Sequence, residues 1–405
     1  MPPENVLMVS DFAQINGGQA KVAIDSARLL ADHGLNVTFF AAVGPVDPLL
    51  DHPRITVECL GFDDILSEAN RLRAMARGIW NSEARARLRR TAAAFDPATT
   101  VLHCHGYAKA LSPSIGPELV SGPLPSVYTM HEYFLACPNG GFYDYQKNEI
   151  CTRKALGPGC LATNCDVRHP AHKLWRVARQ AATWGPGRMP GRLGDVIYIS
   201  EVQRRAMAPY IGAGTRLHYV PNPVPLPELP PVAASANDVF LFVGRLNPEK
   251  GGVMFAEAAR RAGARAVFIG DGAEAEAVRA ANPEAEILGW KRPEEVQDWI
   301  GRARALVFPS LWYETFGLVA CEALGRGVPV VCGAWNAASE FIRDGVNGVC
   351  YAEPSAEALA AAITRVGGLA DFDPRPLRGI VDPGLHVERL LGVYARMTAA
   401  RREVA

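Results

Sequence analysis

The sequence predicts an α/β protein built from two doubly wound domains that face each other across a central cleft. The chain has 405 residues, more than a single hydrophobic core usually organises. Short apolar runs alternate with helical patterns twice, before and after the proline-rich segment 221–231 (PNPVPLPELPP). Because repeated prolines forbid a regular helix or strand, this segment is the expected linker.

The first half contains short apolar runs that are typical of a parallel sheet covered on both faces. They lie at Val6 to Val9, Val37 to Ala41, Ile55 to Leu60, Val101 to His103, Ser126 to Thr129 and Val196 to Ile199. Residues Gln19 to His33 have a helical pattern that ends at Gly34. We therefore expect an N-terminal domain over residues 1–225, with a cysteine-containing insert at about 137–165.

A second alternation begins at Asp238 and predicts a second doubly wound domain over residues 226–383. Its strands are expected at Val239 to Val243, Ala266 to Ile269, Glu286 to Leu288, Ala305 to Phe308, Val328 to Val331 and Gly348 to Tyr351. A final helical pattern, His386 to Met397, lies in the segment 384–405. In such folds ligands bind at the carboxyl ends of the strands, inside the cleft.

Composition and charge argue against a protein that binds nucleic acid, spans a membrane or is secreted. Lys plus Arg equals Asp plus Glu, 42 of each, so bulk charge argues against nucleic acid as a partner. No apolar run reaches the length of about 18 residues that a transmembrane helix needs, and MPPENVLMVS does not resemble a signal peptide. Nine cysteines, an odd number, then suggest reduced thiols and a cytoplasmic protein.

The segment Glu314-Thr-Phe-Gly-Leu-Val-Ala-Cys-Glu322 follows the strand that ends at Phe308. We expect a helix with Glu314 at its mouth and Glu322 about two turns inside, near the same face. Buried carboxylates at the carboxyl end of a strand suit a site that binds hydroxyl groups. The alternative is a buried helix with two incidental acids.

A second segment, Gly244-Arg-Leu-Asn-Pro-Glu-Lys-Gly-Gly252, joins a strand to a helix. Gly244 permits a tight turn, and Arg245 and Lys250 place two cations at a helix N-terminus, which already favours anions. This arrangement indicates a diphosphate site. The alternative is a solvated basic loop.

With these segments in view, the chain resembles glycosyltransferase family 4, retaining enzymes of the GT-B fold that use nucleotide sugars. The matching elements are Gly244 to Gly251, Gly270 to Glu274, Glu314 to Glu322, Glu340 to Gly348, Asn16 to Gly18, His131-Glu132 and Val220 to Pro223. The chain departs from the family pattern at Asn336-Ala337, where two glycines are usual, and at Glu132, where aspartate is frequent.

The resemblance implies transfer of a sugar from a UDP- or GDP-sugar to an acceptor hydroxyl, with retention and without a catalytic metal or further cofactor. The acceptor would be a glycan or a lipid-linked sugar in cell-surface polysaccharide or glycolipid synthesis. The catalytic residues would be His131, Glu314, Arg245 and Lys250. Arg245 and Lys250 would also bind the donor, together with Gly17, Gly18, Gly244, Gly289, Trp290, Glu314, Thr315, Phe316, Gly317, Leu318 and Glu322.

Other functions remain open at this point. The chain could be another GT-B enzyme, such as a nucleotide-sugar epimerase or a sugar phosphorylase, or a non-catalytic protein that binds sugar nucleotides. Gly270-Asp271-Gly272 matches a dinucleotide fingerprint, but Asp271 would put an anion beside the pyrophosphate, so we reject a nicotinamide or flavin cofactor. The particular sugar, the base and the oligomeric state are not determined.

Cys137, Cys151, Cys160 and Cys165 lie in a Gly/Pro/Asn-rich insert. Four thiolates could hold one structural zinc, although the spacing lacks tight C-x-x-C pairs, and free thiols or a conditional disulfide are the alternatives. His103 and His105 flank Cys104 but have no third partner at ligand spacing. We therefore expect these histidines to line the cleft or to be structural.

Residues 168–192 contain no acid. Their cations are Arg168, Lys173, Arg176, Arg179, Arg188 and Arg192, and their tryptophans are Trp175 and Trp184. A basic, Trp-bearing helix can lie on an anionic membrane surface, which would place the protein on the inner face of the membrane. The alternative is a solvated helix with a buried tryptophan.

Overall fold

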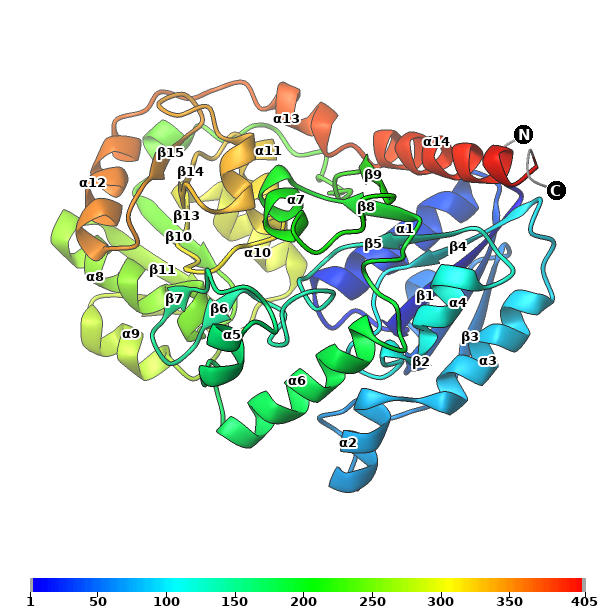
Figure 1. Cartoon of the computed structure of the whole chain (residues 1–405). Helices are drawn as coiled ribbons and strands as arrows, with labels where there is room; N and C mark the ends of the chain where they lie inside the picture. The colour runs from blue at the N-terminus through cyan, green and yellow to red at the C-terminus, as the bar shows by residue number, and fades with distance from the viewer. Residues whose placement is uncertain (1–2, 403–405) are drawn as a thin grey trace.

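The computed structural model describes residues 3–402 and consists of two sheets, every strand pair of which is parallel (Figure 1). The first sheet has the order β3-β2-β1-β4-β5-β8-β9 and the second β12-β11-β10-β13-β14-β15. The predicted fold class, two doubly wound Rossmann-like domains, is confirmed.

The elements of the first sheet follow one another along the first half of the chain. Its strands are β1 (Asn5–Phe12), β2 (Asn36–Val43), β3 (Ile55–Cys59), β4 (Thr100–Cys104), β5 (Ser126–Thr129), β8 (Asp195–Tyr198) and β9 (Arg216–Tyr219). The helices are α1 (Gly18–Asp32), α2 (Arg71–Ile79), α3 (Ser82–Ala93), α4 (Gly116–Ser121), α5 (Pro158–Ala162), α6 (Pro170–Trp184) and α7 (Glu201–Met207). The insert after β5 also forms a small antiparallel hairpin, β6 (Tyr143–Asp144) and β7 (Glu149–Ile150).

The second sheet is built from β10 (Val239–Val243), β11 (Arg265–Ile269), β12 (Glu286–Ile287), β13 (Ala303–Phe308), β14 (Val330–Gly333) and β15 (Gly348–Tyr351). Its helices are α8 (Gly252–Ala262), α9 (Ala275–Ala281), α10 (Pro293–Gly301), α11 (Leu318–Gly325), α12 (Ala356–Gly367) and α13 (Arg375–Ile380). The chain then continues as α14 (Pro383–Arg402), which covers most of the segment 384–405; residues 403–405 lie outside the described residues.

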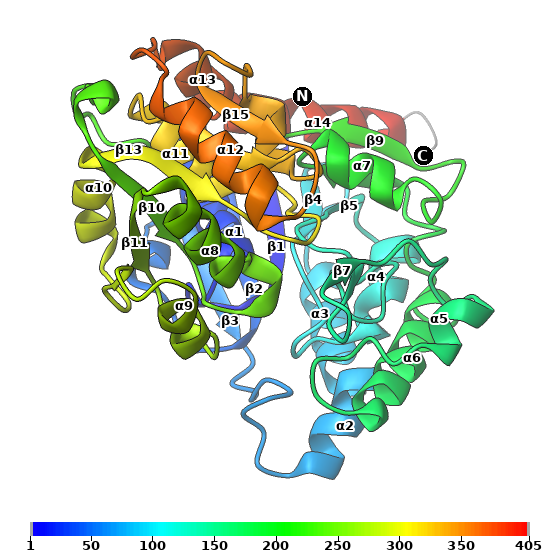
Figure 2. The ribbon, with the colours of Figure 1, turned by 90° about the vertical axis from the view of Figure 1, so that its left-hand side faces the viewer.

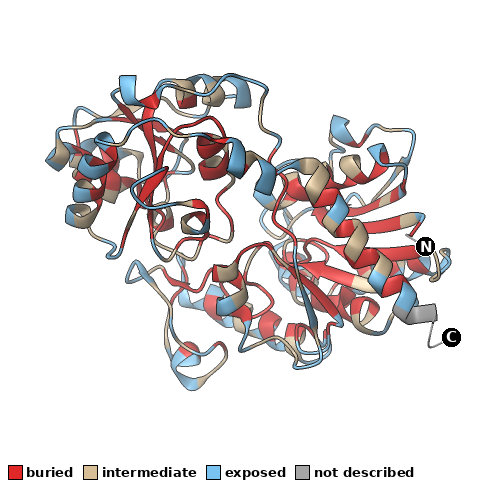
Figure 3. Ribbon diagram, turned by 90° about the horizontal axis from the view of Figure 1, so that it is seen from above, coloured by how far each residue is buried: buried red, intermediate tan, exposed pale blue. Residues whose placement is uncertain are grey.

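Both faces of each sheet are buried, which explains why the strands read as apolar runs. In β1, Val6 and Met8 belong to the core beneath α1 and α14, whereas Leu7 and Val9 belong to the core on the opposite face. This split follows from the two-residue repeat of a strand. Figure 3 shows the buried strands of both sheets inside partly exposed helices.

Helix α14 returns from the second sheet and packs on the first (Figure 1). Val387, Leu390 and Val393 enter the core beneath α1. The Tyr394 hydroxyl bonds His103 Nδ1 of β4 at 2.6 Å, and His386 Nε2 lies 2.9 Å from Ser26 Oγ of α1. Helix α14 is therefore packed and hydrogen-bonded to the first domain.

The two domains also meet directly. The Glu340 carboxylate accepts hydrogen bonds from the backbone N–H groups of Glu201 and Val202 at the start of α7, at 3.0 and 2.7 Å. The Thr315 hydroxyl donates to the His131 carbonyl at 3.0 Å. Among residues 3–402, no helix combines the length and the apolar character needed to cross a bilayer.

Candidate active site

Two loops of the second domain meet where neighbouring strands end. Residues 244–251 follow β10, residues 309–317 follow β13, and these strands pair side by side. Leu311 N–H donates to the Glu249 carbonyl at 2.8 Å. Gly251 has φ 70°, and a Cβ there would lie 2.3 Å from the Pro309 carbonyl oxygen. Only glycine therefore lets these loops approach so closely.

The contact between the loops joins two of the predicted catalytic residues. Lys250 Nζ forms an ion pair with the Glu314 carboxylate, and the Ser310 hydroxyl donates to Glu314 Oε1 at 3.1 Å. Burial would raise the pKa of Glu314, but the Lys250 ammonium and the hydrogen bond from the Ser310 hydroxyl hold that pKa below its usual value. Glu314 is therefore an ionised, buried carboxylate.

Helix α11 begins later than expected. It starts at Leu318, and its N-cap Gly317 has a left-handed φ of 94°. Glu314 therefore lies in the loop before the helix, and Glu322 is only the fifth helical residue. The expectation of one helix carrying both carboxylates on one face is wrong, because a left-handed residue at Gly317 interrupts the helical backbone. Residues 315–317 belong to the same loop, and Leu318 opens the helix.

Glu322 lies within α11, in a different environment from that of Glu314. Its carboxylate accepts a hydrogen bond from Gln297 Nε2 of α10 at 3.1 Å. Burial raises the pKa of Glu322, while Lys21 of α1 and the Gln297 bond lower it. Lys21 belongs to the first domain, so Glu322 lies where the two domains face each other.

Gly17 and Gly18, predicted to contact the donor, are exposed at the start of α1. A Cβ on Gly17 would meet nothing within 4 Å, whereas a Cβ on Gly18 would lie 3.4 Å from Leu318 Cδ1. The first turns of α1 and α11 therefore lie against each other at the cleft. Unpaired N–H groups at helix starts favour anions.

Arg245 is exposed, and none of the ion pairs found in residues 3–402 involves it. Its charge lowers the pKa of Tyr145, beside the insert hairpin, while burial raises that pKa. Gly244 lies in the turn before Arg245, and the Gly244 carbonyl would be 1.9 Å from a Cβ on Gly270. The glycines of the 270–272 segment thus serve close packing of two loops.

Gly289 and Trp290 adjoin this packed pair of loops. Gly270 N–H donates to the Gly289 carbonyl at 2.8 Å, and the Asp271 carboxylate accepts from Trp290 N–H at 2.9 Å. Gly289 has a left-handed φ of 71°. The Trp290 side chain is 70% exposed, so its indole is free to cover a ligand.

His131, at the end of β5, faces these loops from the first domain. Its ring stacks on that of His105, with centroids 5.1 Å apart, and its Nε2 lies 2.9 Å from His105 Nδ1. Burial lowers the pKa of His131 to about 3, so the ring is neutral. His103 bonds Thr129 and Tyr394, and burial also keeps His103 and His105 neutral, as structural residues would be.

Glu132, which follows His131, is a half-buried acid that we did not assign to the site. Burial raises its pKa to about 7, against the opposing effect of Lys109 and Arg179. Those two cations come from distant parts of the chain, so the sequence, which marks Glu132 only as part of the His131-Glu132 element, did not predict its raised pKa.

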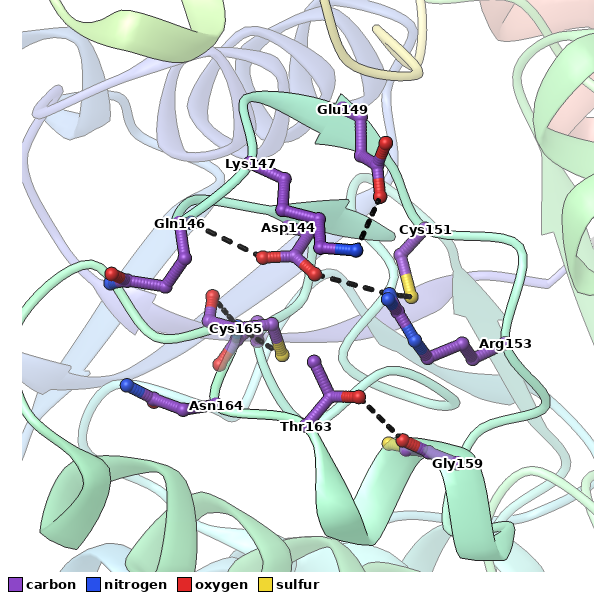
Figure 4. A network of polar contacts seen from close by, with 12 residues as sticks. Asp144, Gln146, Lys147, Glu149, Cys151, Arg153, Gly159, Thr163, Asn164 and Cys165 are labelled. Carbon is purple, nitrogen blue, oxygen red and sulfur yellow. Dashed lines mark hydrogen bonds and ion pairs between the residues drawn. The ribbon is translucent and has the colours of Figure 1, made fainter.

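Of the alternatives for the four cysteines of the insert, the structure does not support a zinc site and records free thiols. Among residues 3–402 no three His, Cys, Asp or Glu side chains are placed to hold a metal ion. Instead the buried Lys173 ammonium lies 3.0 Å from Cys165 Sγ and 3.5 Å from Cys160 Sγ. Cys151 Sγ accepts from Arg153 at 3.5 Å (Figure 4). Cys137 is a buried free thiol. A lysine already occupies the position of the cation.

The basic stretch 168–192 is not one exposed cationic face. Lys173 and Arg179 are buried, and Arg176 pairs with the buried Asp166 at 2.6 Å. The indoles of Trp175 and Trp184 donate inward, to the carbonyls of Met75 and Leu135. The remaining cations, Arg168, Arg188 and Arg192, are exposed. Membrane contact by this stretch would therefore depend on these three exposed cations, because Lys173, Arg176 and Arg179 are engaged within the fold.

The chain is similar in sequence to known glycosyltransferases. Residues 237–367 match the family described as "Glycosyl transferases group 1". The lipopolysaccharide 1,2-N-acetylglucosaminetransferase of Salmonella typhimurium is 29% identical over 152 residues, which are 33% of this chain and 39% of that protein. A D-inositol 3-phosphate glycosyltransferase of Geodermatophilus obscurus is 31% identical over 283 residues, 58% of this chain and 62% of that protein. The chain thus matches less than two thirds of either relative.

Solved structures match over nearly the whole chain. Sucrose-phosphate synthase of Thermosynechococcus elongatus has a TM-score of 0.64 at 19% identity, and 99% of each chain is covered. HepE of Anabaena, solved with UDP and glucose, has a TM-score of 0.62 at 17% identity, covering 96% of this chain and 99% of HepE. At these identities the similarity establishes the fold. The chain is therefore a GT-B protein whose second domain matches the group 1 glycosyltransferases.

Proposed function

We propose that the protein transfers a sugar from a nucleoside diphosphate sugar to an acceptor hydroxyl, with retention at the anomeric carbon. The observation that carries this proposal is the buried Lys250–Glu314 pair at the strand ends, opposite His131. The Salmonella relative is named as an N-acetylglucosaminetransferase of lipopolysaccharide, and HepE was solved with UDP-glucose. These names favour a UDP-sugar donor and a glycan or glycolipid acceptor; a GDP-sugar remains the second candidate.

The donor diphosphate would lie between Arg245 and the first turn of α11. Within residues 3–402 the Arg245 guanidinium forms no ion pair with a carboxylate, so it is available to neutralise the leaving group. Lys250 would act at short range and orient Glu314, because the two are already paired. Neutralising charge that develops on the leaving diphosphate is usually the largest catalytic effect of such groups.

The remaining groups would hold the nucleoside and the sugar. Glu322 would bind the ribose hydroxyls, and the 289–290 turn would contact the base. Glu314 and the backbone of residues 315–318 would hold the donor sugar. His131 Nε2 is occupied by His105, which leaves His131 Nδ1 to contact a sugar hydroxyl.

In the proposed step the bond between the anomeric carbon and the diphosphate oxygen breaks on the face that the acceptor oxygen attacks. The acceptor proton passes to the departing diphosphate oxygen. No side-chain nucleophile is required. In this scheme residues 1–225 bind the acceptor, residues 226–383 bind the donor, and the segment from 384 fastens the two domains.

We also propose that the protein is cytoplasmic and can lie on the inner face of the membrane when its acceptor is lipid-linked. Support comes from the tip formed by α2 and α6, where Leu72 is 77% and Leu174 is 72% exposed. Arg71, next to Leu72 in the sequence, and Arg168, just before α6, are exposed cations of the same region. Exposed leucines next to arginines are typical of a surface that touches anionic lipid.

A thermal-shift screen of UDP- and GDP-sugars, followed by product analysis, tests the proposed activity. A ligand at 100 times its Kd stabilises a protein by about 2.7 kcal/mol. Release of free nucleoside diphosphate that depends on an added glycan acceptor would support transfer. An altered donor sugar formed without acceptor would identify an epimerase instead. Absence of stabilisation by every nucleotide sugar would overturn the proposal.

A further inference from the structure

A positively charged cavity lies in the first domain, between α2 and α6. Its volume is about 220 Å³. The two helices lie side by side in both views (Figure 1 and Figure 2). Phe134, Met75 and Trp175 supply apolar wall. Its five Lys and Arg residues are Arg71, Lys109, Arg168, Arg176 and Arg179, and no carboxylate lines it.

Three of these cations already have partners. Arg176 pairs with Asp166 at 2.6 Å. Arg179 donates to the carbonyls of Ala108 and Pro138, each at 3.1 Å, and its guanidinium lies over the Phe134 ring. Arg71 donates to the carbonyls of Leu66 and Glu68 at 3.3 Å. Arg179 and Arg71 thus keep their full positive charge, because carbonyls do not neutralise it.

The other two cations, Lys109 and Arg168, have no ion pair and no side-chain hydrogen bond among those found in residues 3–402. Lys109 Nζ lies 5.4 Å from the centre of the Phe134 ring. Burial lowers the pKa of Lys109, and Arg179 and Arg176 add to that effect, while the Glu132 and Asp11 carboxylates oppose it without forming an ion pair within residues 3–402. A charge withdrawn from water without a partner is costly, and a bound anion would remove that cost.

The cavity adjoins the cleft through Lys109. The backbone N–H groups of residues 109–111 donate to the Asp11 carboxylate at 2.9 Å, which fixes this loop at the end of β1. Lys109 and Arg179 both act on the pKa of Glu132, the neighbour of His131. A molecule in the cavity would therefore extend toward the sugar-transfer site from the side opposite the donor residues.

We propose that this cavity binds a phosphate group carried by the acceptor, with Lys109 and Arg168 as its principal ligands. The inference rests on the proposed function, because it identifies the acceptor as a phosphorylated molecule. The apolar wall fits a phosphate attached to a lipid, and the cations alone fit the phosphate of a soluble sugar. Both sources share the same recognition chemistry.

The test is calorimetric titration with three probes: inorganic phosphate, glucose 6-phosphate and monomeric dihexanoyl phosphatidic acid. The proteins are the wild type, Lys109→Gln/Arg168→Gln, Arg245→Ala and the control Arg73→Gln. Arg73 is an exposed cation of α2 that does not line the cavity. A hydrogen bond to a charged group is worth about tenfold in affinity, so the double variant should bind at least tenfold more weakly. Arg73→Gln should bind as the wild type does, and Arg245→Ala should keep the phosphate binding that the double variant loses.

The outcomes separate this inference from the donor site. Phosphate binding lost in Arg245→Ala but kept in the double variant would overturn the inference, as would no binding of any probe to the wild type. UDP binding, measured in parallel, reports the proposed function independently. Preference for phosphatidic acid that Trp175→Ala abolishes would assign a lipid phosphate. Preference for glucose 6-phosphate would assign a soluble one.

Discussion

At the scale of single residues, the site depends on charges that are held away from water. Glu314 is 9% exposed and ionised, and its counterion is Lys250, 64 positions earlier in the chain. The sequence marks both residues by their motifs but not their contact. The sequence analysis assigned Lys250 to the diphosphate and Glu314 to the sugar, as if the two residues acted independently. The ion pair between them couples their roles.

This coupling can be measured by a double-mutant cycle. Lys250→Met leaves a buried carboxylate unpaired and should lower the free energy of unfolding by about 3–5 kcal/mol. Lys250→Met/Glu314→Gln should recover most of that loss, because the stranded charge is gone. Urea unfolding of the wild type, Lys250→Met, Glu314→Gln and the double variant completes the cycle. Additive losses in the double variant would mean that the pair does not exist.

The buried histidines predict acid sensitivity. Burial lowers the pKa of His131 to about 3 and that of His386 to about 4. A lowered folded pKa means that the unfolded chain binds more protons, so stability is full above about pH 6.5 and falls as pH decreases toward the folded values. For His131 alone the loss at pH 4 should be on the order of a few kcal/mol.

The measurement is the melting temperature between pH 7.5 and 4, for the wild type and His131→Gln. Glutamine cannot titrate, so the variant should lose less stability across this range. Parallel pH profiles for the two proteins would show that His131 is not buried as a neutral ring.

At the scale of elements, the sequence predicted the strands better than the helix starts. Runs such as Val239–Val243 are buried on both faces, so their apolar character signals a strand directly. Strand β9 (RLHY) was missed, because it lies at the edge of its sheet and carries an arginine and a histidine. The hairpin β6–β7 was also missed, because its strands have two residues each and are too short to form an apolar run.

The start of α11 shows a different limit. Apolar periodicity runs through Phe316 without a visible break, and only the left-handed backbone of Gly317 delays the helix to Leu318. That conformation is set by packing, since a Cβ at Gly317 would lie 3.2 Å from Ala338 Cβ. Such a tertiary contact is invisible in a single sequence.

Residues 244–251 and 309–317 approach each other so closely that one added methyl group should lower the stability of the protein. Gly251→Ala combines a left-handed backbone with a Cβ 2.3 Å from the Pro309 carbonyl. Gly263→Ala has the same backbone strain, φ 62°, in open space. The strain alone costs about 1–2 kcal/mol, so Gly263→Ala should lose that amount and Gly251→Ala clearly more. Chemical denaturation compares them; equal losses would mean that the loops can separate freely.

At the scale of the whole molecule, function depends on two sheets brought together by long-range contacts. The alternation of strands and helices predicted both domains. The sequence did not predict which residues join the two domains. One of them is Glu340, whose carboxylate accepts hydrogen bonds from the start of α7. The cleft motifs were assigned correctly to strand ends. Glu132 was placed beside His131 but given no role, and Lys109 and Lys21 were not assigned to the site, because each acts through neighbours that are distant in sequence.

The proposed activity requires the cleft between the domains to bind a nucleoside diphosphate. Calorimetric titration of UDP and GDP into the wild type, Arg245→Ala and the control Arg261→Ala tests it most directly. Arg261 is an exposed cation at the end of α8, away from the 244–251 loop.

We predict that one of the two nucleotides binds to the wild type and to Arg261→Ala with the same affinity. Arg245→Ala should bind it at least tenfold more weakly, because a charge-assisted contact to the diphosphate is lost. Equal affinity in all three proteins, or no binding of either nucleotide to the wild type, would contradict the account.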